Sequence, residues 1–419
     1  MEPEIEFGRR ALLGTGGAVG LAAAARPAVA AAAPPSQVLN AADFGAVGDG
    51  RTDDTVALQK ALDRTFAGSG TVLMIPPGTY RVTRTLRIAF GSSGSGNLGR
   101  RSGIVGHGAR LDSEIADGGN VLELLCRATV RFVVIEGLDI LGKGRERHGI
   151  YVECDGGGVY FYNFCLRDVN VQGCGGDGCR LVGNVFEGQI VNAYFRSNKG
   201  SGATFAHGSH GGILSALHVF GAVFGQNGEH GAALVRNCYD IAFHGCYFLL
   251  NNQFGLYASN GCTLLSNCGF ENNHAAAADF AGGGYGIRLN NFGTLVGCTA
   301  YSVFHQTGLI HAFVAGRLNM MGCTGSGGGK AAGAGLARLG GSQAGHATLI
   351  GCAGAVQYDN AFEALEIGGP DGGVRFGAHW QSRNLPQFGD YRLWVDRNGR
   401  LRIKRGEPKD DDDGVPVGA

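Results

Sequence analysis

Four titratable side chains in the middle of the chain are candidates for acid–base chemistry. His148, Asp177 and His230 each stand directly before a glycine, and Glu229 precedes His230. Two carboxyl groups about 5–5.5 Å apart suit retaining cleavage of a glycosidic bond, and roughly 6.5–9.5 Å suits inverting cleavage. A histidine can instead remove a proton next to a uronate carboxylate, while the guanidinium of Arg180 neutralises that carboxylate. The alternative is a purely structural role, because Asp and His before glycine are ordinary turn residues.

Tyrosine and arginine recur two residues after the same kind of glycine. They are Tyr151, Arg180, Tyr257 and Arg288. Tyrosine offers a flat apolar ring with a polar edge, which suits a sugar face, and guanidinium binds carboxylates in a bidentate manner. We therefore predict that these four side chains share one outer face and bind substrate. A merely solvated sheet face remains the alternative.

The elements that must position these residues are repeats of 22–31 residues. A glycine followed by alternating residues recurs at steps of 29, 24, 29, 24 and 31, at Gly149, Gly178, Gly202, Gly231, Gly255 and Gly286. A Phe-x-x-Asn pattern recurs at steps of 29, 24 and 22, beginning at Phe195, Phe224, Phe248 and Phe270. Short period-2 segments in repeats of this length predict an all-β solenoid, a single-stranded parallel β-helix.

Stacking of the coils at about 4.8 Å fixes the expected spacing of the candidate residues. His148 and Asp177 would lie one coil, about 5 Å, apart, and Asp177 and Glu229 two coils, about 10 Å, apart. The four phenylalanines would stack inside, and the asparagines three residues later would form an amide ladder at a turn. Small residues, several of them cysteines, accompany these columns and read as core positions.

The two ends of the solenoid differ from its middle. Thr52-Asp53-Asp54 before an amphipathic segment predicts a helix that caps the first coil. An alternating segment around Asn398-Gly399 predicts a C-terminal hairpin. We expect the β-helix domain to cover residues 38–380, and the hairpin with an acidic tail to cover residues 381–419.

The N-terminal segment resembles an export signal. Gly8-Arg9-Arg10 precedes a weakly apolar run, and Ala28-Val29-Ala30 is a cleavage candidate. This pattern is similar to a bacterial twin-arginine (Tat) signal peptide over residues 1–30, with a linker over residues 31–37. The resemblance implies a periplasmic or secreted protein that folds in the reducing cytoplasm before export.

The composition excludes several functional classes. The chain has 35 Lys+Arg and 35 Asp+Glu, so a formal net charge of zero and no basic block argue against nucleic-acid binding. No segment of the mature chain is long and apolar enough to span a membrane. The twelve cysteines include no C-x-x-C, and the sequence indicates no metal site and no cofactor.

Residues 43–55, Asp43-Phe-Gly-Ala-Val-Gly-Asp-Gly-Arg-Thr-Asp-Asp-Thr55, together with Ile75-Pro-Pro-Gly-Thr-Tyr80, resemble the opening of the pectate-lyase-like superfamily. That resemblance implies a right-handed β-helix, a polysaccharide substrate and, among tailspike-like members, homotrimers. The chain departs from polygalacturonases because it has no Asn-Thr-Asp, so their catalytic residues are not carried over. The favoured interpretation is a glycoside hydrolase acting in a groove along the coils. A polysaccharide lyase or uronate C5-epimerase, and a non-catalytic polysaccharide-binding or structural β-helix, are the alternatives.

Overall fold

The computed structural model describes fourteen stretches of the chain. They are residues 37–91, 98–154, 157–209, 211–258, 262–273, 284–301, 311–326, 335–339, 345–352, 356–358, 362–368, 387–388, 391–410 and 412–417. The predicted signal peptide lies outside them, and so does all but the last residue of the predicted linker. Side chains are described for most residues up to Asn273, but the side chain of Arg288 is not described.

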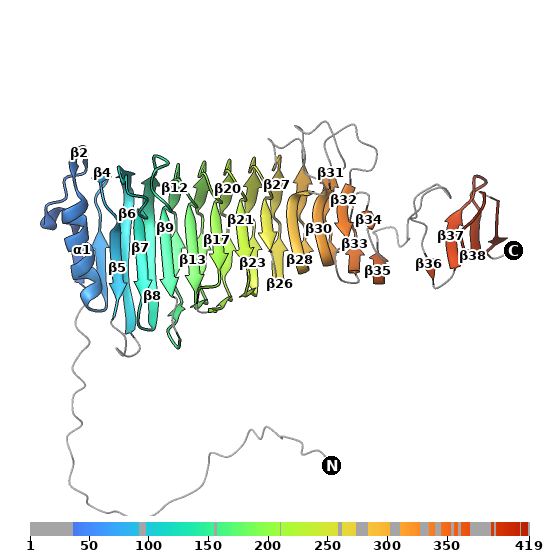
Figure 1. Ribbon diagram of the computed structural model, residues 1–419, viewed down its shortest axis with the longest axis horizontal. Coiled ribbons are helices and arrows are strands. Elements are labelled where there is room, and N and C mark those ends of the chain that lie inside the picture. Colours follow the sequence, from blue (N-terminus) through green and yellow to red (C-terminus); the bar gives the residue numbers. More distant parts are fainter. Residues whose placement is uncertain are drawn as a thin grey trace, which may run out of the picture. The chain divides into compact units, whose positions relative to one another are not determined.

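Thirty-five strands join in one continuous parallel sheet that winds through successive coils (Figure 1). The coils present three faces, which we call sheets I, II and III. Sheet I contains β5 (Leu86–Phe90), β7 (Leu122–Cys126), β9 (Ile150–Cys154), β13 (Cys179–Gly183), β17 (Ala203–Ala206), β21 (Ala232–Val235) and β25 (Leu256–Ala258). Sheet II contains β11 (Cys165–Arg167), β15 (Gln189–Val191), β19 (His218–Phe220), β23 (Ile241–His244), β26 (Cys262–Ser266) and β33 (Gly345–Ile350). Sheet III contains β12 (Asn170–Gln172), β16 (Tyr194–Arg196), β20 (Val223–Gly225), β24 (Tyr247–Leu249), β27 (Gly269–Glu271), β29 (Thr299–Tyr301) and β31 (Thr324–Ser326).

The remaining strands begin, bridge or extend these sheets. The first coils use β1 (Gln37–Asn40), β2 (Asp49–Asp53), β3 (Thr71–Met74) and β4 (Gly78–Val82). Four long strands run through more than one face: β6 (Leu98–Ser113), β8 (Val130–Leu141), β28 (Gly284–Val296) and β30 (His311–Met321). Short strands between sheets I and II are β10 (Phe161–Tyr162), β14 (Val185–Phe186), β18 (Leu214–Ser215) and β22 (Cys238–Tyr239), and the last coils add β32 (Gly335–Leu339), β34 (Val356–Tyr358) and β35 (Phe362–Gly368).

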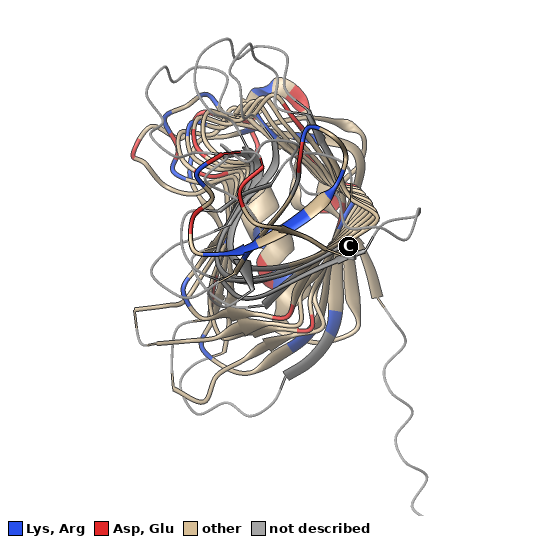
Figure 2. Ribbon diagram, turned by 90° about the vertical axis from the view of Figure 1, so that its right-hand side faces the viewer, with Lys and Arg blue, Asp and Glu red and all other residues tan. Residues whose placement is uncertain are grey.

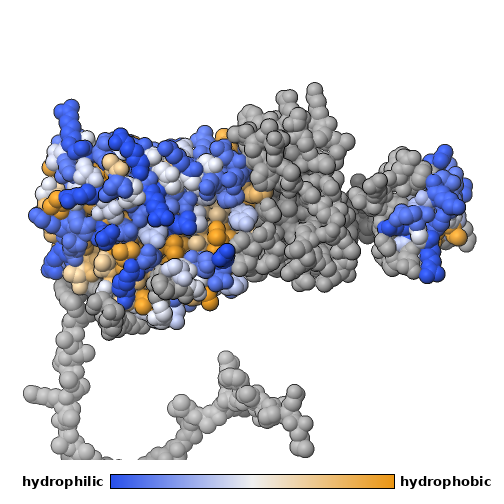
Figure 3. Space-filling view, in the orientation of Figure 1, coloured by the Kyte–Doolittle hydropathy of each residue, from blue (hydrophilic) through white to orange (hydrophobic). Residues whose placement is uncertain are grey.

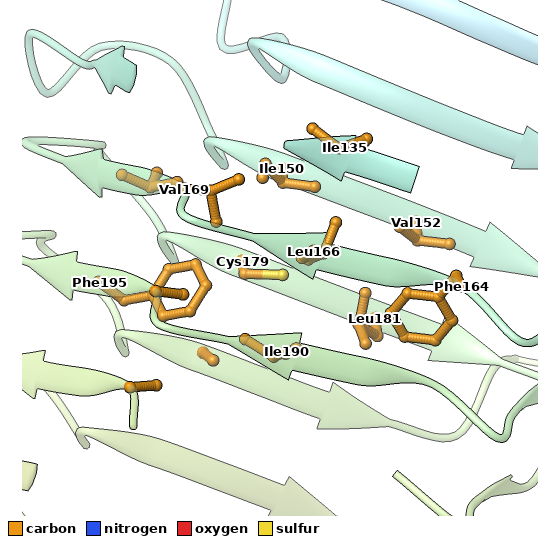
Figure 4. Packing of buried hydrophobic residues seen from close by; sticks show 14 of the residues in the cluster. Ile135, Ile150, Val152, Phe164, Leu166, Val169, Cys179, Leu181, Ile190 and Phe195 are labelled. Carbon is orange, nitrogen blue, oxygen red and sulfur yellow. The ribbon is translucent and has the colours of Figure 1, made fainter. Parts of the chain in front are cut away.

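The core is built from columns of inward side chains that recur once per coil. Phe195, Phe224, Phe248 and Phe270 are in register and stack with ring centroids 5.5, 5.0 and 4.7 Å apart. Aliphatic residues and Cys179 fill the space between the sheets (Figure 4). The predicted phenylalanine column is therefore confirmed.

A buried amide ladder runs beside the phenylalanines. Asn198 Nδ2 donates to Asn227 Oδ1 at 3.1 Å, Asn227 to Asn251 at 2.8 Å, and Asn251 to Asn273 at 2.7 Å. Oδ1 of Asn227, Asn251 and Asn273 also accepts the backbone N–H of the preceding asparagine, as Asn227 Oδ1 does from Asn198 N at 3.2 Å. The four asparagines are buried and form the amide ladder that the sequence predicts at this turn.

The predicted helical cap is confirmed. The first turn is a short 3-10 helix, η1 (Ala41–Phe44), and the cap itself is α1 (Thr55–Ala67), which buries Leu58, Leu62 and Phe66. The carboxylate of Asp54 accepts the backbone N–H groups of Val47 and Gly48, at 2.6 and 3.2 Å, rather than capping its own helix. Asp54 of the opening motif therefore ties the first loop to the start of the helix.

The C-terminal residues form a separate antiparallel sheet of β36 (Gln387–Phe388), β37 (Tyr391–Val395), β38 (Leu401–Arg405) and β39 (Val415–Pro416). The β37–β38 pairing confirms the predicted hairpin. Trp394 is fully buried, and Arg402 Nε donates to Asp396 Oδ2 at 2.6 Å. Asp412 and Asp413 pair with Arg402 and Lys404, so these members of the acidic tail are part of this small sheet.

Lys and Arg positions are interspersed with Asp and Glu positions along the described ribbon (Figure 2). Hydrophobic side chains also reach the surface between hydrophilic ones (Figure 3). Within the described ranges, no helix is long and apolar enough to cross a membrane.

Candidate functional site

The outward column of sheet I contains the four predicted binding residues. Strand register places Tyr151 beside Arg180, then Thr204, Ala233, Tyr257 and Arg288 in successive coils. Thr204 and Ala233 have short, buried side chains, so no long side chain projects from the column between Arg180 and Tyr257. The backbone register therefore places all four residues in one column on the same face of sheet I, as predicted.

Tyr151 bonds to a carboxylate that the sequence did not single out. Its hydroxyl donates to Glu153 Oε2 at 3.0 Å, and Arg127 Nη2 donates to Glu153 Oε1 at 2.8 Å. Burial, reinforced by the negative charge of Glu153, raises the pKa of Tyr151 to about 12. The pair is thus a protonated phenol beside a carboxylate, a proton donor and a proton acceptor in contact. Strand alternation from Gly149 would have placed Glu153 on the same face as Tyr151.

His148 stacks against Tyr151, and a single backbone contact determines the tautomer of His148. The N–H of Asp177 donates to His148 Nδ1 at 2.9 Å, so in the neutral ring the proton is on Nε2. Burial lowers the pKa of His148 to about 4; the negative charge of Asp177 opposes this shift, and the positive charge of Arg180 adds to it. Its Nε2–H has no hydrogen-bond partner in the described part of the chain. At neutral pH His148 is therefore a donor rather than a base, and its ring stacks against Tyr151 with centroids 5.8 Å apart.

Asp177 is buried, and both of its carboxylate oxygens are occupied. Oδ1 accepts the backbone N–H of Ser201 at 2.9 Å, and Oδ2 accepts from Arg180 Nη1 at 2.8 Å. The side chain of Asp177 is 6% exposed and that of Arg180 is 34% exposed. The carboxylate therefore anchors the guanidinium of Arg180, which is partly exposed and belongs to the outward column of sheet I. Together, Arg127, His148, Tyr151, Glu153, Asp177 and Arg180 make up what we call the Tyr151 cluster.

Glu229 and His230 lie farther along the stack, in different surroundings. Glu229 is exposed, and its Oε2 accepts from Ser201 Oγ at 3.4 Å. His230 stacks on Tyr257, with centroids 4.9 Å apart, and its Nδ1 accepts the backbone N–H of Phe254 at 3.3 Å. The structure therefore brings His148 and Asp177 together with Tyr151 and Arg180, and groups His230 with Tyr257. That Asp177 and Glu229 act as an acid–base pair stays a prediction.

The described residues hold no group of three or more His, Cys, Asp or Glu side chains arranged for a metal ion. The Tyr151 cluster instead combines fixed cationic groups with a proton donor and acceptor. Two guanidinium groups, those of Arg127 and Arg180, contact its carboxylates. Such a set can bind an anionic sugar and exchange protons with it.

Stacked parallel coils under a helical cap define this chain as a parallel β-helix protein. The family model described as "Rhamnogalacturonase A/epimerase, pectate lyase-like" matches residues 38–118, and "Right handed beta helix region" matches residues 128–300. A third model, "Capsule depolymerase", matches residues 344–419. The resemblance to the pectate-lyase-like superfamily and the right-handed β-helix fold are thereby confirmed.

Curated relatives match parts of the chain. Mannuronan C5-epimerase AlgE4 of Azotobacter vinelandii is 31% identical over 153 residues, which is 36% of this chain and 22% of that protein. The capsule K30/K69-specific depolymerase of Klebsiella phage K64-1 is 30% identical over 162 residues, 37% of this chain and 21% of that protein. Mannuronan C5-epimerase AlgE3 of A. vinelandii is 40% identical over 78 residues, 19% of this chain and 4% of that protein. The chain spans less than a quarter of the length of each of these relatives.

Solved structures share the fold at low identity. The A-module of A. vinelandii mannuronan C-5 epimerase AlgE6 superimposes with a TM-score of 0.54 at 17% identity, covering 79% of this chain and 98% of that module. The enzymatically active domain of bacteriophage CBA120 tailspike protein 2 gives 0.58 at 14% identity, covering 88% of this chain and 58% of that domain. At these identities the likeness shows the fold alone.

Proposed function

We propose that this chain is an enzyme that processes a uronate-containing polysaccharide on the outer face of sheet I. In this proposal it removes the proton next to the sugar carboxylate, as a lyase or a C5-epimerase. The observation that carries the proposal is the Tyr151–Glu153 pair directly beside the anchored guanidinium of Arg180. The partial matches to mannuronan C5-epimerases support a uronate polymer, and the partial match to a capsule depolymerase supports a polysaccharide substrate.

Arg180, Glu153 and Tyr151 have separate roles in this reaction. Arg180 binds the sugar carboxylate and stabilises the negative charge that develops when the neighbouring proton leaves. Glu153 takes that proton, and the Tyr151 hydroxyl, which lies on the same side of the sugar, protonates the departing glycosidic oxygen in elimination. Epimerisation would need a proton donor on the opposite face of the carbanion. The existing hydrogen bond then returns the proton from Glu153 to Tyr151, so the pair ends in its starting state.

A polymer rather than a single sugar suits the length of the binding column. Tyr151 and Tyr257 are four coils apart, about 19 Å at the usual strand spacing. A sugar chain that lies over Thr204 and Ala233 would contact the Tyr151 cluster at one end and Tyr257 at the other. We propose stacking on Tyr257 as a remote contact that orients the chain.

Hydrolysis through Asp177 and Glu229, which the sequence favoured, is less well supported by the geometry. The side chain of Asp177 is 6% exposed, whereas that of Glu153 is 26% exposed, and a nucleophile or base must be able to reach the substrate. Hydrolysis is therefore an outcome that the assay below distinguishes. We also propose export through the twin-arginine segment, on the strength of the Gly8-Arg9-Arg10 pattern alone; trimer formation stays a prediction.

The experiment is a screen of the chain from residue 31 onward on polymannuronate, polyguluronate, polygalacturonate, glucuronan and neutral glucans. Ultraviolet absorbance of unsaturated uronates, reducing ends and the proton NMR signals of each uronate epimer are followed in parallel. Unsaturation indicates a lyase, a changed epimer ratio without chain cleavage indicates an epimerase, and reducing ends without unsaturation would show hydrolysis. Retention on one polymer without any product would favour the binding module and overturn the proposal.

Two tyrosine variants test the site itself. Tyr151→Phe removes the proton donor, and we expect kcat to fall about 10²- to 10⁴-fold, the usual contribution of a positioned acid or base. Tyr247→Phe is the matched control, because Tyr247 on sheet III makes the same kind of bond, its hydroxyl donating to Glu271 Oε2 at 2.5 Å. Equal activity of the two variants would contradict the assignment of the Tyr151 cluster.

A further inference from the structure

Five cysteines form a single column at the turn between sheets II and III: Cys246, Cys268, Cys298, Cys323 and Cys352. Backbone hydrogen bonds place them in successive coils. The residue after Cys268, Cys298 and Cys323 donates to the carbonyl of the preceding cysteine in the column, and the N–H of Gly322 donates to Ile350 O, two residues before Cys352. The N–H of Gly269 donates to Cys246 O at 3.0 Å, and that of Thr299 to Cys268 O at 2.9 Å. A turn residue with positive φ, glycine or asparagine, precedes every member.

The thiols of this column are neighbours from end to end. Each one perturbs the pKa of the next, Cys246 with Cys268, Cys268 with Cys298, Cys298 with Cys323, and Cys323 with Cys352. All five are free thiols. Four of them are buried and Cys352, at one end, is half-buried, so a reagent in solution reaches the column there.

Core packing alone does not require sulfur at this position. The two preceding coils carry Ala193 and Ala222 there, since the N–H of Val223 donates to Ala193 O and that of Tyr247 to Ala222 O, at 2.8 and 2.9 Å. Both alanines are fully buried. The column thus accepts alanine in some coils and has five contacting thiols in the next five.

We propose that this column is a disulfide-forming site, in which neighbouring thiols of the folded chain are oxidised in pairs, beginning with Cys323 and Cys352. Adjacent coils are about 4.8 Å apart, within the Cα–Cα range of roughly 4.4–6.8 Å that a disulfide spans. The inference does not rest on the proposed polysaccharide activity. An oxidising compartment, which the export signal would provide, is where such pairs persist.

The oxidant is a disulfide, either a small molecule or a thiol oxidase. The Cys352 thiolate attacks one sulfur of that disulfide and releases the first oxidant thiol, leaving a mixed disulfide on Cys352. Cys323 loses its proton, attacks Cys352 Sγ and releases the second oxidant thiol. Two protein thiols become one disulfide, and their two electrons and two protons pass to the oxidant.

Exchange along the column then carries oxidation inward. The thiolate of Cys298 attacks Cys323, which moves the disulfide one coil inward and frees Cys352 for a second oxidation. Five thiols allow two disulfides, so one thiol remains. Hydrogen bonding to the neighbouring thiol is the first cause that raises the pKa of Cys268 and Cys298 to about 12 and that of Cys323 to about 11, so inward exchange is faster at higher pH.

The test uses the full chain, reduced and then exposed to oxidised glutathione, alkylated, digested and mapped by mass spectrometry without reduction. Trypsin sites at Lys330 and Arg338 separate Cys323 from Cys352, so a joined pair of peptides identifies that disulfide. We expect this link first, followed by loss of four of the five column thiols. Denatured chain treated in the same way should give mixed pairings instead.

Two controls separate the column from ordinary thiol chemistry. Cys165 is half-buried like Cys352, but its neighbours in adjacent coils are Val134 and Gln189, so it should carry only a glutathione adduct. In Cys323→Ala, which restores the residue found in earlier coils, Cys352 should likewise stop at the adduct and the inner thiols should stay reduced. Cys323→Ser serves the same purpose if the alanine variant does not fold. An unlinked Cys323–Cys352 pair beside a modified Cys165, or links between molecules only, would overturn the proposal.

Discussion

Asp177→Asn is the perturbation that best separates a positioning role from a catalytic one. The substitution keeps the shape of the side chain, and its amide oxygen can still accept the N–H of Ser201. Its amide nitrogen, however, would face Arg180 Nη1, which now lies 2.8 Å from Asp177 Oδ2. Two donors in contact repel each other, so the guanidinium would be released from its position on the outer face.

The size of the effect follows from that one lost contact. A hydrogen bond to a charged group contributes about 1.5–3 kcal/mol, and every 1.4 kcal/mol corresponds to a tenfold change in an equilibrium constant. Arg180 in the proposed function binds the sugar carboxylate, so the loss should weaken substrate binding about 10- to 150-fold. We therefore expect a rise in KM of this size, with kcat reduced less than KM is raised.

The assay is steady-state kinetics on whichever uronate polymer the screen identifies. Asp139→Asn is the matched control, because Asp139 Oδ2 accepts from Arg110 Nη2 at 3.4 Å in an exposed pair on sheet III. That variant should leave both constants unchanged. If Asp177→Asn instead loses kcat by several orders of magnitude with KM unchanged, Asp177 is a reacting group and the reasoning from its buried contacts is refuted.

Three further predictions concern stability. Asn227→Ala removes four hydrogen bonds of the buried ladder and should lower the free energy of unfolding, measured by urea titration, by roughly 2–6 kcal/mol. The control Gln172→Ala loses one hydrogen bond to Arg196 and should lower it by under about 1 kcal/mol. The lowered pKa of His148 means that the unfolded chain binds a proton more readily, so its contribution to stability is present above pH 6.5 and is lost as the pH falls toward about 4; His148→Gln should abolish this part of the acid sensitivity. A Cβ at Gly202 would lie 2.5 Å from Gly231 O, so Gly202→Ala should prevent soluble expression of folded protein, while Gly221→Ala, with φ of +59° and open space, should cost about 1–2 kcal/mol.

Most of the architecture could be predicted because a β-helix repeats one local pattern. The glycine register placed Tyr151, Arg180 and Tyr257 on one column, and the structure confirms that register coil by coil. The phenylalanine and asparagine columns follow from the same counting. In-register stacking converts sequence spacing directly into spatial adjacency, which is unusual among folds.

The chemistry of the site could be predicted only in part, because it depends on contacts between coils that spacing does not specify. Glu153 acquires its partner Arg127 from the turn after β7, 26 residues earlier in the chain. Likewise, the tautomer of His148 is set by the backbone N–H of Asp177, a donor that every residue but proline has. The sequence shows which side chains are present. It does not show which of their atoms already have a hydrogen-bond partner within the protein.

The same stacking explains why Asp177 is better suited to hold a neighbour than to react. A residue at the turn before sheet I lies between the coil above and the coil below, and Asp177 accordingly bonds Ser201 on one side and contacts His148 on the other. Residues in the outward strand positions, such as Tyr151 and Glu153, have only lateral neighbours and keep one side open. In this β-helix, turn positions therefore favour positioning roles and outward strand positions favour contact with substrate. The Asp177→Asn and Tyr151→Phe variants test these two halves of the argument separately, the first through KM and the second through kcat.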